Sequence, residues 1–146
     1  MSYASAQELR QRIGESVFNE IYGLSERSEL SGCSEITDDL ESAGAEIDGA
    51  LASRYALPVT GPRSLALLKD WNLTLAEERA YARPAGSGFT EKIKRRVDQV
   101  RKYLEMIRTD AFKLPDAAEN SSGSAGGIAL IRRDEPIFDR KKMDGY

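Results

Sequence analysis

The sequence has 146 residues, of which 40% are apolar and 31% are charged, a composition typical of one soluble domain large enough to hold a hydrophobic core. Histidine is absent and Cys33 is the only cysteine, so the commonest general base, the commonest transition-metal ligand and an internal disulfide are all excluded. No apolar run approaches the ~18 residues that span a bilayer, and the N-terminus has no signal-peptide pattern. We therefore expect a non-enzymatic protein without cofactor or metal, made in the cytosol and not bound to a membrane.

The formal net charge of -3 is unevenly distributed along the chain. Residues 1–60 carry 11 acidic and 4 basic side chains, whereas residues 61–146 carry 13 acidic and 17 basic ones, so the two parts have charges of -7 and +4. This separation of charge suits head-to-tail association between copies, or binding of an anionic partner on the basic side. In a small helical protein such an imbalance also arises by chance. The charge distribution alone leaves these alternatives open.

Two short helices are predicted near the N-terminus. Ser5 and Glu8 form a capping-box pattern, in which the serine side chain accepts a hydrogen bond from the backbone of Glu8 and the glutamate accepts one from the backbone of Ser5. Gly14 permits a bend between the two helices, and Gly23 suits the left-handed residue that ends the second. Residues 24–33 have the composition of a polar loop.

A helix of about five turns is predicted at 34–54. Ser34 is its N-cap candidate, and apolar residues then recur at steps of three and four. The helix is expected to end near Arg54, ahead of Pro58, because proline disfavours helical geometry in the residue before it. The outer face of this helix is acidic and is formed by Asp38, Asp39, Glu41, Glu46 and Asp48.

Two further helices are predicted at 62–82 and 90–110. The first starts with Pro62 at the first helical position and is apolar enough, with Trp71 on its inward face, to lie in the middle of a bundle. The second is capped by Thr90 and is basic on its outer surface. Its narrow apolar seam consists of Ile93, Val97, Val100, Leu104, Ile107 and Ala111.

These elements predict an all-α fold, a small bundle of four to five helices with an extended C-terminal arm. Helices 34–54 and 62–82 are expected to be antiparallel neighbours, since the connection between them is short. We expect residues 1–114 to form the helical domain, residues 115–127, rich in glycine and serine, to form a flexible linker, and residues 128–146 to form the arm.

The C-terminal arm is apolar enough to need a surface to bind. Residues 128–132 are rich in β-branched residues and are followed by turn formers, which is the pattern of a short strand that adds to the sheet edge of a partner. The alternative is that the arm folds back on its own helical domain. The residues expected to contact the partner are Ile128, Leu130, Ile131, Arg132, Arg133, Pro136, Ile137, Phe138, Arg140, Met143 and Tyr146.

Three other patterns involve side chains that could carry out chemistry or bind a partner. The adjacent carboxylates Asp38 and Asp39 diverge by about 100° on a helix and cannot share a proton, and Cys33 has no histidine to activate it. Tyr55 is either an interface anchor or a tyrosine that closes the end of the core. The basic helix 90–110 leaves a second hypothesis open, a helical DNA-binding or regulatory module, although no recognition motif accompanies it.

The order of these patterns resembles a known family. An N-terminal Tyr3-Ala4-Ser5 is followed by an acidic helix with Ile47-Asp48, by Arg54-Tyr55-Ala56-Leu57-Pro58, by an apolar and then a basic helix, and by Phe138-Asp139-Arg140 and Met143-Asp144-Gly145-Tyr146. This arrangement is similar to the small Mu-like phage and prophage proteins regarded as head-to-tail joining, or connector adaptor, proteins. Its most specific part is the segment from Arg54 to Pro58.

The resemblance implies a structural subunit of the virion neck that is present in the host cytoplasm before assembly. Such subunits form a ring, here expected to hold twelve copies, between the portal protein and a tail-side neck or stopper protein, and double-stranded DNA passes through without specific binding. A ring needs a contact between unlike faces, so the acidic helix 34–54 of one copy is expected near the basic helix 90–110 of the next. The residues expected there are Asp38, Asp39, Glu41, Glu46, Arg95, Arg96, Arg101 and Lys102.

Overall fold

The computed structural model describes residues 2–24 and 30–120, and these form an all-α bundle, as predicted. The elements in chain order are α1 (Ala6–Ile13), α2 (Glu15–Tyr22), a 3-10 turn η1 (Leu30–Gly32), α3 (Ser34–Leu51), α4 (Pro62–Tyr81) and α5 (Glu91–Arg108). Within the described ranges the only β pairing is one antiparallel bridge between Tyr55 and Glu119. None of the described helices is long and apolar enough to cross a membrane.

Several predicted helix ends are confirmed. The side chain of Ser5 accepts a hydrogen bond from the amide of Glu8 at 3.3 Å, and the carboxylate of Glu8 accepts one from the amide of Ser5 at 2.9 Å. Gly14, with a φ of 99°, separates α1 from α2, and Gly23, with a φ of 63°, ends α2 in the left-handed conformation. The side chain of Thr90 caps α5.

Other predicted boundaries are wrong. Ser34 is the first residue of α3 and not its cap, because η1 leads directly into the helix through Cys33. Helix α3 ends at Leu51 and not at residue 54, since the chain turns there and brings the next aromatic residue into the core. Ala111 is exposed and outside α5, because Asp110 adopts a φ of 63° and breaks the helix.

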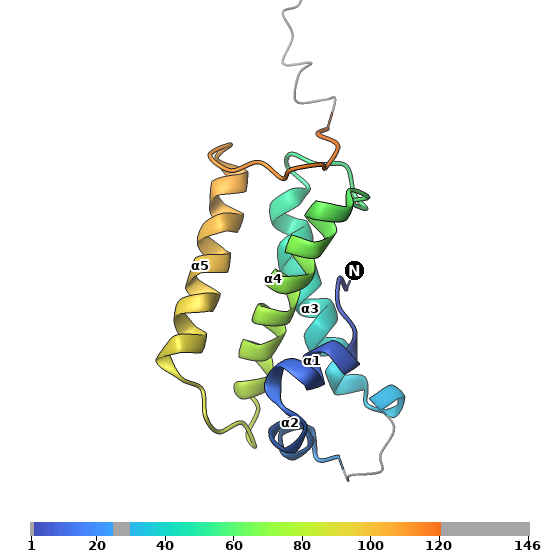
Figure 1. Cartoon of the computed structure of the whole chain (residues 1–146), viewed down its shortest axis with the longest axis vertical. Coiled ribbons are helices and arrows are strands. Elements are labelled where there is room, and N and C mark those ends of the chain that lie inside the picture. The colour runs from blue at the N-terminus through green and yellow to red at the C-terminus, as the bar shows by residue number, and fades with distance from the viewer. Residues whose placement is uncertain (1, 25–29, 121–146) are drawn as a thin grey trace, which may run out of the picture.

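The three long helices run alongside one another, with α4 antiparallel to both α3 and α5 (Figure 1). The predicted antiparallel pairing of α3 with α4 is therefore confirmed. Helices α1 and α2 cover α4 near the end of the bundle at which α3 begins (Figure 1).

Helix α4 is the central helix, as predicted. Leu68, Trp71 and Leu75 are at most 2% exposed. The indole ring of Trp71 stacks on Tyr103 of α5 with 5.7 Å between ring centroids, and the ring of Phe112 lies 6.2 Å from the indole. Helix α5 contributes the narrow seam that the sequence predicts, formed by the buried side chains of Ile93, Val97, Val100, Leu104 and Ile107.

Candidate assembly surfaces

Tyr55 closes one end of the bundle. The residue is only 3% exposed, and its phenol oxygen accepts a hydrogen bond from the backbone amide of Leu114 at 2.9 Å. The backbone of residues 54–56 is paired with that of residues 118–120 through hydrogen bonds of 3.0 and 2.8 Å. Of the two interpretations of Tyr55, closure of the helical core is confirmed, and the same residue positions the chain that follows α5.

Asp116 supplies the N-terminal cap of α4 from a distant part of the chain. The N-cap residue, Gly61, has no side chain, so the first amides of α4 need an acceptor from elsewhere. The carboxylate of Asp116 accepts hydrogen bonds from the amides of Arg63 at 2.9 Å and Ser64 at 2.8 Å and from the Ser64 hydroxyl. These bonds, chiefly that of the hydroxyl, lower the pKa of Asp116. A Cβ at position 61 would overlap Asp116, so the cap depends on glycine there.

Residues 115–120, which the sequence places at the start of the linker, contact the helical domain. Besides the Asp116 cap, the side chain of Asn120 donates a hydrogen bond to the carbonyl of Ala52 at 3.2 Å. The helical body therefore extends to Asn120, at the end of the bundle where α4 begins (Figure 1). Residues 121–127 and all the expected partner-binding residues, from Ile128 to Tyr146, lie outside the described residues, and the division into linker and arm stays a prediction.

Four of the eight residues expected between copies are paired inside the chain, and Asp39 is the first. Its carboxylate binds the guanidinium of Arg83 at 2.8 Å and accepts a hydrogen bond from the hydroxyl of Tyr22 at 2.7 Å. Burial and this hydrogen bond raise the pKa of the Tyr22 phenol well above its ordinary value. Asp39 therefore fastens α2 and the end of α4 to α3.

Glu46 and Arg101 join α3 to α5 within one copy. Their side chains form an ion pair at 3.0 Å, while Glu46 also binds Arg79 at 3.1 Å and Arg101 also binds Glu78 at 2.6 Å. These carboxylates raise the pKa of the Arg101 guanidinium. The sequence predicts that the acidic helix of one copy meets the basic helix of the next. In the structure, ion pairs within a single chain already neutralise part of the charge on these two helices.

Arg96 takes part in a third network, which surrounds a buried carboxylate. Glu77 of α4 is 3% exposed and lies 3.2 Å from a guanidinium nitrogen of Arg96 and 3.4 Å from one of Arg12. Because a buried carboxylate needs such partners, Glu77 ties both α1 and α5 to the central helix.

The remaining four residues expected between copies are free to meet a partner. Asp38 and Glu41 on α3 and Arg95 and Lys102 on α5 are exposed, and none forms an ion pair with another described residue. Arg95 and Lys102 are separated by two helical turns and therefore lie on the same face of α5.

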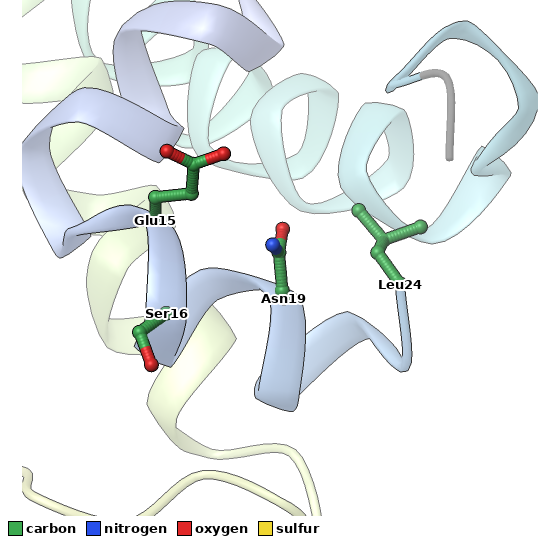
Figure 2. A pocket seen from close by; sticks show the side chains of 4 residues that line it. All are labelled: Glu15, Ser16, Asn19 and Leu24. Atoms are coloured by element: carbon green, nitrogen blue, oxygen red, sulfur yellow. The ribbon is translucent and has the colours of Figure 1, made fainter. Parts of the chain in front are cut away.

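A hollow of about 640 Å³ lies beside α2 and is lined by Glu15, Ser16, Asn19 and Leu24. In Figure 2 the side chains of Glu15, Asn19 and Leu24 point to the same side of the helix, whereas Ser16 points away from it. These groups do not include a nucleophile with an adjacent base. Among residues 2–24 and 30–120 there is also no cluster of three metal-ligating side chains.

Comparison with known proteins gives one family match. Residues 3–131 match the family model described as Bacteriophage Mu, Gp36, a span that covers the whole helical body and continues beyond it. No curated protein matches the chain.

Proposed function

Because the chain belongs to the bacteriophage Mu Gp36 family, we propose that it is a structural protein of the virion neck, a connector adaptor between head and tail. It forms a ring of twelve copies beneath the portal protein and presents its other side to a tail-side neck or stopper protein. Double-stranded DNA passes through the ring without specific binding. The role is structural and not enzymatic.

The observation that carries this proposal is the anchored segment 114–120. Its hydrogen bonds to Tyr55 and to the first amides of α4 fix the place on the bundle to which the predicted linker and C-terminal arm are attached. An arm joined by a short linker to a fixed place reaches a defined area of a neighbouring protein and gains effective concentration there once the helical body is in place. This arrangement suits a subunit that is added to a preformed head.

The helical body supports the same role. Its central helix is buried, its surface charges are largely joined in networks across α1, α3, α4 and α5, and each network holds two or more helices together. Such a body keeps its shape while its faces contact different proteins. The family membership supplies the phage context, and the proteins proposed to contact these faces are the portal, the neighbouring adaptors and the tail-side proteins.

The test adds the purified full chain to phage heads that lack it. We expect a ring of density at the portal vertex by electron microscopy and restored attachment of tails. The matched variant lacks residues 128–146 and should leave the vertex bare. Binding to tails but not to heads, or no binding to either, would show that the proposed role is wrong.

A DNA-binding or regulatory module is the second candidate, and the exposed cations of α5 favour it. Arg95 and Lys102 would contact phosphates, so binding of a duplex should weaken steeply with salt. Acidic residues recur on the same helix at Glu91, Asp98 and Glu105, seven residues apart, and repel a polyanion. Tight, sequence-specific binding of a duplex by the full chain would favour this candidate over the connector.

A further inference from the structure

Among the described residues, exposed charged side chains that form no ion pair are most numerous on two helices, α5 and α3. Lys92, Arg95 and Lys102 of α5, which we call the basic row, are exposed and form no ion pair with another described residue. The same is true of Glu35, Asp38 and Glu41 of α3, which we call the acidic row. The two rows therefore have opposite charge, and within the described part of the chain none of their members forms an ion pair, although the Arg83 guanidinium lies close enough to attract Glu35.

The rows differ in length. Lys92 and Lys102 are ten positions apart, about 15 Å along the helix axis, and Glu35 and Glu41 are six positions apart, about 9 Å. Long lysine and arginine side chains can reach across this difference. A shallow hollow of about 490 Å³, whose lining includes Lys92, Arg95 and Gln99, lies beside the basic row and offers room for side chains of a docked helix.

The rows also lie on different sides of the molecule. Helix α5 forms one side of the bundle, whereas the first turns of α3 lie on the other side, close to α1 and α2 (Figure 1). Two unlike, complementary faces on one subunit produce a head-to-tail contact, which closes into a ring when the rotation between copies allows it.

We propose that the basic row of one copy docks on the acidic row of the next copy. This proposal rests on the proposed connector function, and it identifies the faces by which the subunits of the ring meet. It differs from the contact expected from sequence, because Asp39, Glu46, Arg96 and Arg101 hold the chain itself together and do not serve the interface. The opposite charge of the two rows on one subunit favours a second copy as the occupant.

Cross-linking by engineered cysteines tests the contact directly. In a Cys33→Ser background, one preparation carries Asp38→Cys and a second carries Arg95→Cys, and the two are mixed at high concentration and low salt and then oxidised. We expect mixed disulfide dimers to predominate over dimers of either preparation alone, because a head-to-tail contact joins unlike faces. Glu20→Cys, at an exposed acidic position of α2, is the matched control for Asp38→Cys and should cross-link poorly. No enrichment of the mixed dimer over this control would overturn the proposal.

Charge reversal provides the second measurement. Asp38→Lys with Glu41→Lys, or Arg95→Glu with Lys102→Glu, should weaken self-association in sedimentation, and all four changes in one chain should restore it. Glu20→Lys, which reverses an exposed charge on α2 outside both rows, should leave self-association unchanged. Failure of the four-fold variant to recover would count against pairing of the two rows.

The possible results distinguish a wrong contact between copies from a wrong connector function. If a chain with one row reversed still joins heads in normal copy number, the contact is wrong and the connector role stands. If the rows cross-link but the chain never joins heads, the contact stands and the connector role is wrong. If reversal of the basic row abolishes binding of a DNA duplex and leaves cross-linking unchanged, DNA is the occupant of the row and the contact is wrong.

Discussion

The phenol oxygen of Tyr55 accepts a hydrogen bond from the backbone amide of Leu114, 59 residues later in the chain, at 2.9 Å. Both residues are buried, so water does not replace this bond. The pair joins the turn after α3 to the segment after α5 and holds the end of the bundle closed.

Replacing Tyr55 by phenylalanine keeps the ring in the core and removes only the phenol oxygen that accepts the hydrogen bond from Leu114. The buried amide of Leu114 is then unsatisfied, and we expect the free energy of unfolding to fall by about 1 to 3 kcal/mol. Urea denaturation followed by circular dichroism measures the change. An unaltered midpoint would mean that the amide finds another partner.

Gly61→Ala tests the Asp116 cap. The added methyl group overlaps Asp116, so the cap must open, and loss of a helix cap costs about 0.5 to 2 kcal/mol. Gly49→Ala is the matched control, because position 49 is exposed within α3 and its methyl group meets nothing. The control should stabilise the protein by up to about 1 kcal/mol through its better helix propensity. Equal effects of the two changes would contradict the cap.

The cap also predicts a pH dependence. The folded pKa of Asp116 is lowered from its ordinary value of 3.8, so its stabilising contribution is complete above that pH and is lost as the pH falls through the lowered folded value. We expect Asp116→Asn to be less stable than the unmodified chain at neutral pH and to lose less stability between neutral pH and pH values below 3.8. Thermal melts across this range compare the two, and parallel curves would show that another carboxylate dominates.

Trp71→Ala removes the largest ring of the core. The indole is 2% exposed and stacks on Tyr103, so we expect a loss of about 3 to 5 kcal/mol. Leu57→Ala, at a leucine that is 40% exposed, should stay within about 0.5 kcal/mol of the parent. Similar melting temperatures for the two variants would refute the central position of α4.

Two truncations distinguish the anchored segment from the arm. A chain that ends at residue 127 keeps the Leu114, Asp116 and Asn120 contacts and should melt close to the full chain. A chain that ends at residue 113 loses all of them and should melt at a clearly lower temperature. Unfolding of the longer truncation would show that the arm folds back on the helical domain.

The helices could be predicted because their signals are local. The Ser5 capping box, the glycine at position 14, the Thr90 cap and the apolar stripes of the long helices all act within a few residues, and the structure contains each of them. The burial of Trp71 follows from the same periodicity.

The partners of the charged groups could not be predicted. Glu46 and Arg101 are 55 residues apart, and the sequence identifies one acidic and one basic helix without showing whether they meet within a copy or between copies. The role of Asp116 could not be predicted either, because the only signal in the sequence is that Gly61 has no side chain to cap α4. Composition alone places residues 115–120 in a linker, whereas hydrogen bonds to distant residues hold them on the bundle.

The Asp116 cap has a consequence for biosynthesis. Ser64 and Asp116 are separated by 52 residues, which a ribosome adds in about 3 to 10 s at common rates of translation. Throughout that interval the first amides of α4 lack their hydrogen-bond acceptor, so the N-terminus of the central helix is uncapped. The nascent chain completes its core only when the segment after α5 has left the ribosome, so the arm that follows becomes available to partners after the body that carries it has closed.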